Sequence, residues 1–123
     1  MPVLVYFHGG GFTGGKKRWT PLQENALNNG IAAVSANYRL VKPEGLTVAD
    51  SMADAARVVQ FLRTKADLWN IDPERIAVSG TSAGGCMAVW LAMHDDRADP
   101  ASEDPVLRES SRLTFAIGRG APT

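Results

Sequence analysis

A serine within a short glycine-bearing stretch is the first place where the sequence suggests chemistry. Residues 80–84 read Gly-Thr-Ser-Ala-Gly, which matches the G-x-S-x-G pattern of a sharp strand-to-helix turn. Such a turn lifts the serine clear of a sheet, where a base and a carbonyl carbon can both reach it. Gly80 and Gly84 have no Cβ, so the strand and the helix can cross closely. The pattern predicts Ser82 as a nucleophile and the N–H of Ala83 as an oxyanion donor at the helix N-terminus.

Other interpretations of this turn use the same residues. A glycine-rich strand-to-helix turn can bind phosphate or can serve only as a connection. Residues 80–84 lack the lysine of a phosphate-binding P-loop and the spacing of G-x-G-x-x-G. Cys86, one helical turn after Ser82, is a possible second nucleophile, but a lone free cysteine is more often a small buried residue. The serine therefore remains the preferred nucleophile.

A second glycine-rich stretch follows an apolar run near the N-terminus. His8 is followed by three glycines, Gly9, Gly10 and Gly11. Successive glycines let the backbone curl and expose N–H groups, which can form the other half of an oxyanion hole. We expect Gly10 and Gly11 to donate together with Ala83. The alternative is a flexible loop without function, but two motifs that each follow a strand, in this order, favour acyl-transfer chemistry.

Apolar patterning predicts the elements that position these two motifs. Continuous apolar runs predict buried strands over residues 3–7, 31–35, 76–79 and 113–117. Capping signals and apolar spacings of three and four predict a helix that starts at residue 21 and ends near residues 28–30, and helices over residues 48–69 and 87–93. Strands that alternate with helices predict an α/β fold of about four parallel strands with helices on both faces. Both glycine-rich stretches then lie at carboxyl ends of strands, where ligands bind in such sheets.

Composition bounds the class of protein. The sequence has 123 residues, of which 45% are apolar and 21% charged, which suits one globular domain. Thirteen basic and thirteen acidic residues give zero formal charge, so nothing in the charge favours nucleic acid or an anionic membrane as a partner. No apolar run approaches the ~18–20 residues of a membrane span, and the N-terminal residues lack the pattern of a signal peptide. The cellular compartment stays open.

No metal or cofactor is predicted. The acidic residues of the 95–104 segment do not follow the spacing of a calcium loop, so we interpret them as a solvated surface. Arg39 could bind a substrate carboxylate, but a structural ion pair or a hydrogen bond to nearby backbone is the preferred interpretation. The expected partner is a small-molecule ester, and the oligomeric state stays open.

Four stretches together resemble a known enzyme family. They are residues 3–12, with His-Gly-Gly-Gly; 37–40, Asn-Tyr-Arg-Leu; 71–76, Ile-Asp-Pro-Glu-Arg-Ile; and 80–85. The chain resembles part of an α/β-hydrolase of the esterase/lipase group with this motif, which includes hormone-sensitive-lipase-like, carboxylesterase-like and feruloyl-esterase-like enzymes. The resemblance implies a partial α/β-hydrolase fold and carboxylic-ester hydrolysis through an acyl-enzyme at Ser82. It also implies that His8 supports the glycine loop and is not the base.

The family's catalytic acid and base lie well beyond its serine, in the order Ser, Asp or Glu, His. Little sequence follows Ser82, and His94 would lie ~18 Å away along a continuous helix axis. We therefore expect residues 1–123 to be the N-terminal part of one catalytic domain, truncated at both ends and inactive alone. The alternatives are a non-catalytic truncated protein or pseudoenzyme that only binds ligands, or a serine peptidase or thioesterase of the same fold.

Overall fold

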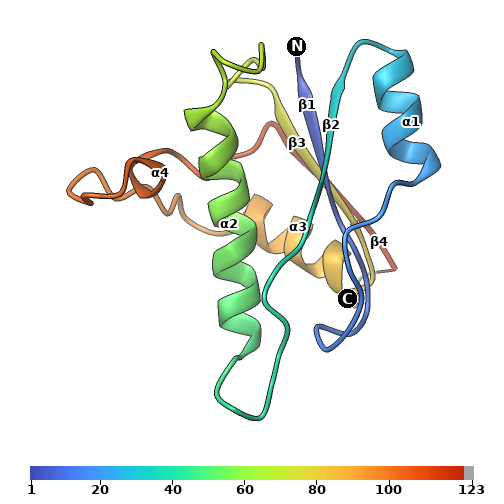
Figure 1. Ribbon diagram of the computed structural model, residues 1–123, viewed down its shortest axis with the longest axis vertical. Coiled ribbons are helices and arrows are strands. Elements are labelled where there is room, and N and C mark those ends of the chain that lie inside the picture. The colour runs from blue at the N-terminus through green and yellow to red at the C-terminus, as the bar shows by residue number, and fades with distance from the viewer. Residues whose placement is uncertain (121–123) are drawn as a thin grey trace.

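The computed structural model describes residues 1–120, which form one parallel sheet flanked by helices (Figure 1). The strands are β1 (Val3–Phe7), β2 (Ala32–Ala36), β3 (Ile76–Thr81) and β4 (Phe115–Arg119). The helices are α1 (Pro21–Asn28), α2 (Val48–Thr64), α3 (Ala83–Met93) and α4 (Pro105–Arg108). All neighbouring strands pair in parallel, in the order β2-β1-β3-β4. The predicted four-stranded parallel α/β fold is confirmed.

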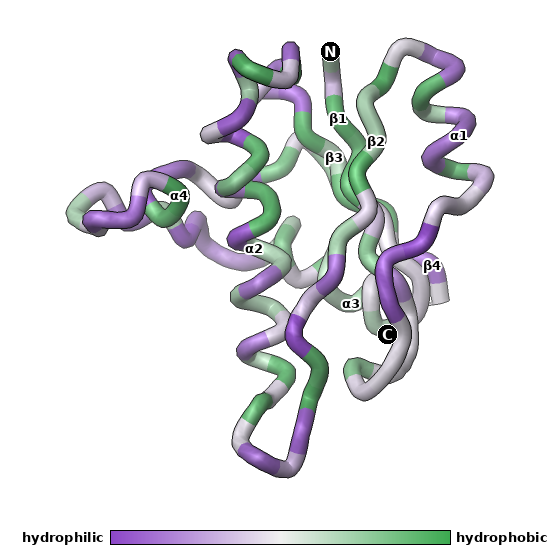
Figure 2. The backbone as a smooth tube through the Cα atoms, viewed as in Figure 1, coloured by the Kyte–Doolittle hydropathy of each residue, from purple (hydrophilic) through white to green (hydrophobic). Residues whose placement is uncertain are grey.

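Helices lie on both faces of the sheet, as the apolar runs predicted. Val3, Val5 and Phe7 of β1 pack with α2 and α3 in the larger apolar core. Leu4 points to the other face, where it packs with Ala26 of α1. Figure 1 shows α2 and α3 on one side of the strands and α1 on the other. Because β1 is buried on both faces, it is apolar without alternation, and Figure 2 shows this apolar character along the central strands.

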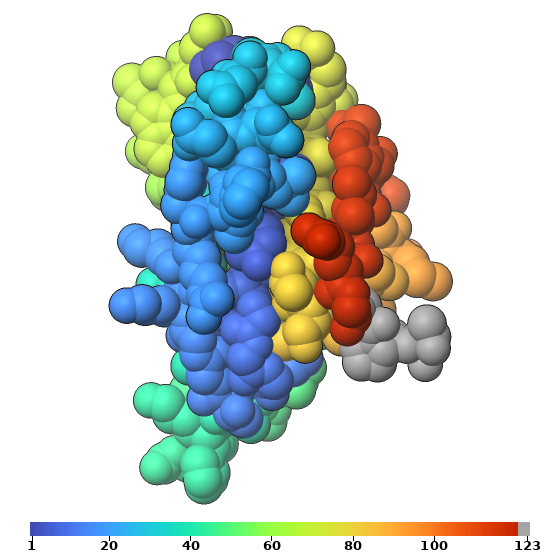
Figure 3. Space-filling view, turned by 90° about the vertical axis from the view of Figure 1, so that its right-hand side faces the viewer, coloured from blue at the N-terminus to red at the C-terminus, as the bar shows by residue number. Residues whose placement is uncertain are grey.

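The face that carries α1 is only partly covered. In Figure 3, α1 lies over one side of this face, while β3 and β4 remain visible beside it. A groove between α1 and β4 is lined by Leu22, Ala77, Phe115 and Ile117, among other residues. Phe115 and Ile117 remain 54% and 47% exposed. The edge strands β2 and β4 are therefore less buried than β1, although the sequence predicted the second strand to be buried.

Helix α2 begins where the sequence predicted and ends five residues earlier, at Thr64 and not at Trp69. The Thr64 hydroxyl donates to the Phe61 carbonyl, and the chain leaves the helix at Lys65. One further turn follows, in which the Trp69 N–H donates to the Lys65 carbonyl at 2.9 Å. That turn keeps the helical apolar spacing without continuing the helix. Within residues 1–120, no helix is both long and apolar enough to cross a membrane.

Element boundaries after α2 also differ from the prediction. Strand β3 runs to Thr81 and α3 starts at Ala83, so the turn predicted over residues 80–85 is Ser82 alone. Strand β4 starts two residues later than expected, at Phe115; before it, the Thr114 N–H donates to the Ile76 carbonyl and the Thr114 hydroxyl accepts the Ile76 N–H. The short helix α4 was not predicted, and it begins at Asp104, whose side chain accepts the Val106 N–H.

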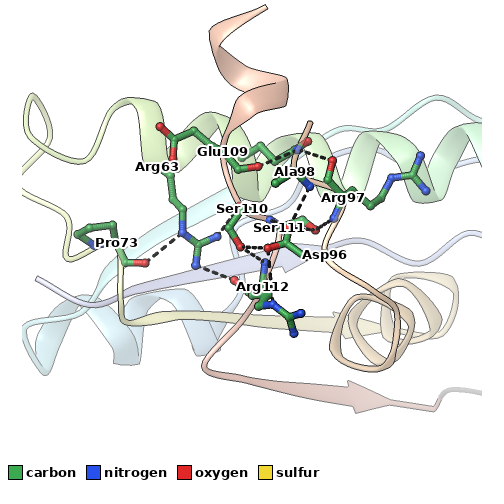
Figure 4. Close-up of polar contacts among 10 residues, drawn as sticks. Arg63, Pro73, Asp96, Arg97, Ala98, Glu109, Ser110, Ser111 and Arg112 are labelled. Atoms are coloured by element: carbon green, nitrogen blue, oxygen red, sulfur yellow. Dashed lines mark hydrogen bonds and ion pairs between the residues drawn. The ribbon is translucent and has the colours of Figure 1, made fainter. Parts of the chain in front are cut away.

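Polar side chains fix the irregular segment between α3 and β4 against α2 (Figure 4). The Arg63 guanidinium of α2 donates to the carbonyls of Pro73, Ser110 and Arg112. Burial lowers the pKa of Arg63, and nearby acidic groups oppose this. Asp96 accepts the N–H groups of Ala98 and Ser111 and the Ser110 hydroxyl. These bonds set the entry of the chain into β4.

Candidate active site

Ser82 is the single residue between β3 and α3. Its φ of 55° and ψ of −113° lie outside the region that non-glycine residues normally adopt. The Ser82 N–H donates to the Arg119 carbonyl of β4 at 2.7 Å, and the Ser82 carbonyl accepts the Cys86 N–H at 3.0 Å. Main-chain bonds on both sides thus hold the residue in its strained conformation, and its side chain is exposed at the carboxyl edge of the sheet.

Four glycines let α3 lie directly against the strands. A Cβ on Gly80 would lie 2.1 Å from the Gly84 carbonyl, and one on Gly84 would lie 1.9 Å from the Phe7 carbonyl. A Cβ on Gly118 would lie 2.9 Å from the Gly85 carbonyl. We call Gly80, Gly84, Gly85 and Gly118 the glycine seam. The sequence motif singled out Gly80 and Gly84, whereas the contact between Gly85 and Gly118 depends on the register of β4.

The glycine triplet lies beside the serine. A Cβ on Gly9 would lie 2.9 Å from the Thr81 carbonyl oxygen and 3.3 Å from the Ser82 Cβ. Strands β1 and β3 pair with Phe7 opposite Gly80, so both glycine-rich stretches leave the sheet at the same level. The two motifs that the sequence singled out, 70 residues apart, therefore come together at one edge of the sheet.

Three main-chain amides near the serine have no acceptor among the described residues. Within residues 1–120, the N–H groups of Gly10, Gly11 and Ala83 make no hydrogen bond. Gly10 and Gly11 have φ angles of 134° and 64°, which glycine adopts readily. These amides are available to an added anion or carbonyl oxygen.

The loop after the triplet folds back on itself. The Gly10 carbonyl accepts the N–H groups of Thr13 and Gly14, both at 3.1 Å. A Cβ on Gly15 would lie 2.5 Å from the Gly9 carbonyl oxygen and 2.7 Å from His8 Nδ1. Gly15 is therefore part of the site, although the sequence patterns did not single it out.

The two histidines of the chain bond to main-chain groups and not to Ser82 within residues 1–120. His8 is 1% exposed, and its Nδ1 lies 2.7 Å from the Gly9 carbonyl oxygen. His94 ends α3, with its Nδ1 3.0 Å from the Trp90 carbonyl oxygen. Within residues 1–120, neither imidazole hydrogen-bonds to the serine. Each imidazole instead faces a main-chain carbonyl oxygen of its own segment.

Tyr38 is a buried residue at this site to which the sequence patterns gave no role. Its hydroxyl donates to the His8 carbonyl at 2.7 Å. Its ring stacks on the imidazole with centroids 4.4 Å apart and planes 12° apart. Burial raises the pKa of Tyr38, and Tyr6 adds to the effect, so the hydroxyl stays protonated and able to donate. Thirty residues separate Tyr38 from His8, so no local spacing could have linked them.

Arg39, the other charged candidate near the site, is paired within the fold. Arg39 donates through Nε to Asp54 and lies 4.0 Å from Asp50, which confirms the structural ion pair. The hydrogen bond that Arg39 donates to the Asp54 carboxylate raises the pKa of Arg39. Within residues 1–120, no group of three or more His, Cys, Asp or Glu side chains gathers in a metal-binding arrangement.

Comparison with known proteins gives a consistent group of relatives. The family model BD-FAE matches residues 1–117. The chain is 31% identical to a probable carboxylic ester hydrolase, LipM, of Mycobacterium tuberculosis, over 93% of this chain and 27% of that protein. It is 39% identical to tuliposide A-converting enzyme 2 of Tulipa gesneriana, over 78% of this chain and 28% of that protein. The chain thus spans little more than a quarter of these relatives.

Solved structures repeat the pattern. An acetyl ester-xyloside bifunctional hydrolase from Caldicellulosiruptor lactoaceticus has a TM-score of 0.80 and 35% identity, over 94% of this chain and 42% of that one. Esterase 2 of Thermogutta terrifontis, in a form phosphorylated by paraoxon, has a TM-score of 0.77 and 30% identity, over 94% of this chain and 44% of that one. These likenesses extend the match from sequence to the arrangement of strands and helices.

Proposed function

The chain belongs to the BD-FAE family of α/β-hydrolase esterases, and we propose that it is the nucleophile-bearing part of a serine carboxylic-ester hydrolase. One observation carries the proposal. Ser82, in its strained turn, lies beside a glycine loop that presents amides without an acceptor among residues 1–120. An acyl-transfer enzyme needs this pairing of a nucleophile with oxyanion donors.

The proposed reaction runs through an acyl-enzyme. Ser82 Oγ attacks the ester carbonyl carbon, and the N–H groups of Gly10, Gly11 and Ala83 stabilise the oxyanion of the tetrahedral intermediate. The intermediate collapses with loss of the alcohol, and water then hydrolyses the acyl-serine to release the acid and restore the hydroxyl. A base must take the serine proton and return it to the leaving alcohol.

The base is proposed to come from outside residues 1–120. Neither His8 nor His94 bonds to the serine, and the relatives are more than three times as long as the region that matches. We therefore propose that residues 1–123 belong to one longer catalytic domain whose further residues supply the Asp or Glu and the His. Without that imidazole, Ser82 is a weakly nucleophilic hydroxyl at neutral pH, and the 123-residue chain alone turns over no ester.

The test uses the full-length protein with a p-nitrophenyl ester and with paraoxon. We expect ester turnover that Ser82→Ala lowers by several orders of magnitude. We also expect one diethylphosphoryl group on Ser82 by peptide mass spectrometry. Cys86→Ala is the matched control, because Cys86 is the nucleophilic side chain one helical turn after Ser82. The Cys86→Ala enzyme should retain turnover. Turnover that survives Ser82→Ala, or labelling at another residue, would contradict the proposal.

A protein without this activity would give a different pattern. A non-catalytic member of the family would show neither turnover nor paraoxon labelling in the full-length form. A peptidase or thioesterase of the same fold would be labelled at Ser82 but would prefer an amide or a thioester over the matched oxygen ester. The same preparations, assayed with the three matched substrates, separate these cases.

A further inference from the structure

Tyr38 contacts the glycine loop from the connection between β2 and α2. Only 6% of Tyr38 is exposed. Besides the stack on His8, its ring makes edge contacts with Phe7 and Phe12, each with centroids 6.4 Å apart. These three rings enclose the tyrosine on several sides, so its hydroxyl has little freedom to point elsewhere.

Hydrogen bonds from Tyr38 and from His8 fix two consecutive peptide planes of the glycine loop. The Tyr38 hydroxyl donates to the His8 carbonyl, and because a peptide is planar, this bond also orients the N–H of Gly9. His8 Nδ1 faces the Gly9 carbonyl oxygen, which can only accept, so Nδ1 carries the proton. That second bond orients the next peptide plane, which contains the N–H of Gly10. The imidazole that makes it is the ring on which Tyr38 stacks.

The same connection also holds the far end of the triplet. Phe12 has a φ of 66°, a strained value for a residue that is not glycine. Its carbonyl accepts the Val41 N–H at 2.7 Å. Tyr38 and Val41 therefore anchor the triplet at His8 and at Phe12, on either side of the proposed oxyanion donors.

We propose that Tyr38 is a positioning residue that orients the Gly10 N–H toward the oxyanion, through the His8 carbonyl and the stacked imidazole. The proposal rests on the proposed function. Tyr38 acts through His8 and does not touch the substrate. Because the oxyanion exists only after attack, loss of the hydroxyl should lower kcat and leave KM nearly unchanged.

The test is Tyr38→Phe in the full-length enzyme, which keeps the ring and removes the hydroxyl. Loss of an oxyanion donor costs ~10²–10³ in kcat, and a donor that is only misdirected should cost less, roughly tenfold. KM should stay within about twofold, since ground-state contacts are intact. A boronic acid, which mimics the tetrahedral oxyanion when bound to the serine, should bind roughly tenfold more weakly. The Gly10 amide resonance should also shift.

The matched control is Ser51→Ala. Ser51 also has a buried hydroxyl that donates to a main-chain carbonyl, that of Arg39 in the same connection. This variant should lower the melting temperature and leave kcat, boronic acid affinity and the Gly10 resonance unchanged.

Each result decides between defined cases. Wild-type kcat and boronic acid affinity in Tyr38→Phe would overturn the positioning role. Equal losses of kcat in Tyr38→Phe and Ser51→Ala would also overturn it, because they would reflect general destabilisation. Turnover that persists in Ser82→Ala would overturn the proposed function and this role with it. A dead Ser82→Ala beside an unaffected Tyr38→Phe would overturn the positioning role alone.

Discussion

Ser82 depends on a strand outside its own motif. A non-glycine residue with positive φ costs roughly 1–3 kcal/mol, which the surrounding structure must offset. The offset includes the bond from the Ser82 N–H to the Arg119 carbonyl, at the end of β4. The position of the serine hydroxyl is thus set by β3, α3 and β4 together.

At the residue scale, Gly10 and Gly11 should differ in how strongly their substitution lowers activity. A Cβ on Gly10 would lie 2.1 Å from the Gly14 carbonyl oxygen, whereas a Cβ on Gly11 would lie 3.9 Å from the Thr13 hydroxyl. In the full-length enzyme, Gly10→Ala must rearrange the loop and should lower kcat by ~10²–10³. Gly11→Ala keeps its N–H and meets only the strain of its φ, so kcat should fall by roughly tenfold or less.

Steady-state ester hydrolysis by the two variants measures this difference. Equal losses would show that the loop does not have the conformation described here, and a larger loss in Gly11→Ala would reverse the assignment of the tighter position.

Sequence could identify the serine and the triplet because each motif is local and each chemical requirement is met within a few residues. Tyr38 could not be identified in this way, because its contact with His8 exists only once β1 and β2 pair. The same holds for Gly118, whose need to lack a side chain follows from where β4 meets α3. Positions that are defined by chain pairing leave little trace in local spacing.

At the scale of elements, the glycine seam decides whether α3 can lie on the sheet. An alanine in a helix interior is normally favoured over glycine by about 1 kcal/mol. Gly84→Ala should instead destabilise the protein, because the added Cβ would overlap the Phe7 main chain. We expect a loss of about 3 kcal/mol or more in the free energy of unfolding.

Gly14→Ala is the control for this prediction, since a Cβ on Gly14 meets nothing within 4 Å. Its unfolding free energy should lie within about 0.5 kcal/mol of wild type. Urea unfolding of both full-length variants gives the comparison. A Gly84→Ala protein as stable as wild type would exclude the close packing of α3 on β1.

The segment between α3 and β4 should show a defined pH dependence through Asp96. Burial tends to raise the pKa of Asp96, but hydrogen bonds from Ser110, Ser111 and Ala98 and the charge of Arg112 outweigh it and lower the pKa. A carboxyl whose folded pKa is lowered stabilises the protein above its unfolded pKa, about 3.9, and loses that contribution as the pH falls toward the folded pKa.

Asp96→Asn should therefore lower the free energy of unfolding by about 1 kcal/mol at pH 7, because hydrogen bonds to a charged group are weakened. The difference from wild type should shrink below about pH 4, where the wild-type carboxyl also becomes neutral. Asp95→Asn, at the exposed neighbouring position, should match wild type throughout. A constant difference between wild type and Asp96→Asn down to pH 2 would contradict the assignment.

Element prediction from sequence succeeded where burial and capping agree. Strand β1 has the predicted bounds because it is apolar on both faces. Helix α1 begins at the predicted Pro21, after Thr20, whose N–H donates to the Gln23 side chain, and it ends within the predicted region. The end of α2 was missed because apolar spacing persists through the next turn. Helix α4 was missed because it is four residues long and none of its residues is buried.

At the scale of the whole molecule, apolar surface remains on the face that α1 leaves open and along α3. Phe115 and Ile117 flank the groove beside α1, and Val89 and Met93 are exposed on α3, the latter at 79%. Figure 3 shows the open side of the sheet as a continuous surface over β3 and β4. Exposed apolar side chains gathered in this way favour association in water. Strand β4 adds an unpaired edge to the same region.

We therefore expect the isolated 123-residue chain to self-associate, as measured by sedimentation velocity across a concentration series. The double variant Phe115→Lys, Ile117→Lys places two positive charges on the open face of the sheet. It should therefore raise the fraction of monomer. Leu68→Lys is the matched control, because Leu68 is 76% exposed but lies in the turn after α2, away from the groove. If Leu68→Lys restored the monomer as well as the double variant does, association would follow from overall hydrophobicity and not from the open face of the sheet. A wild-type chain that stays monomeric at all concentrations would show that this face tolerates water despite its apolar side chains.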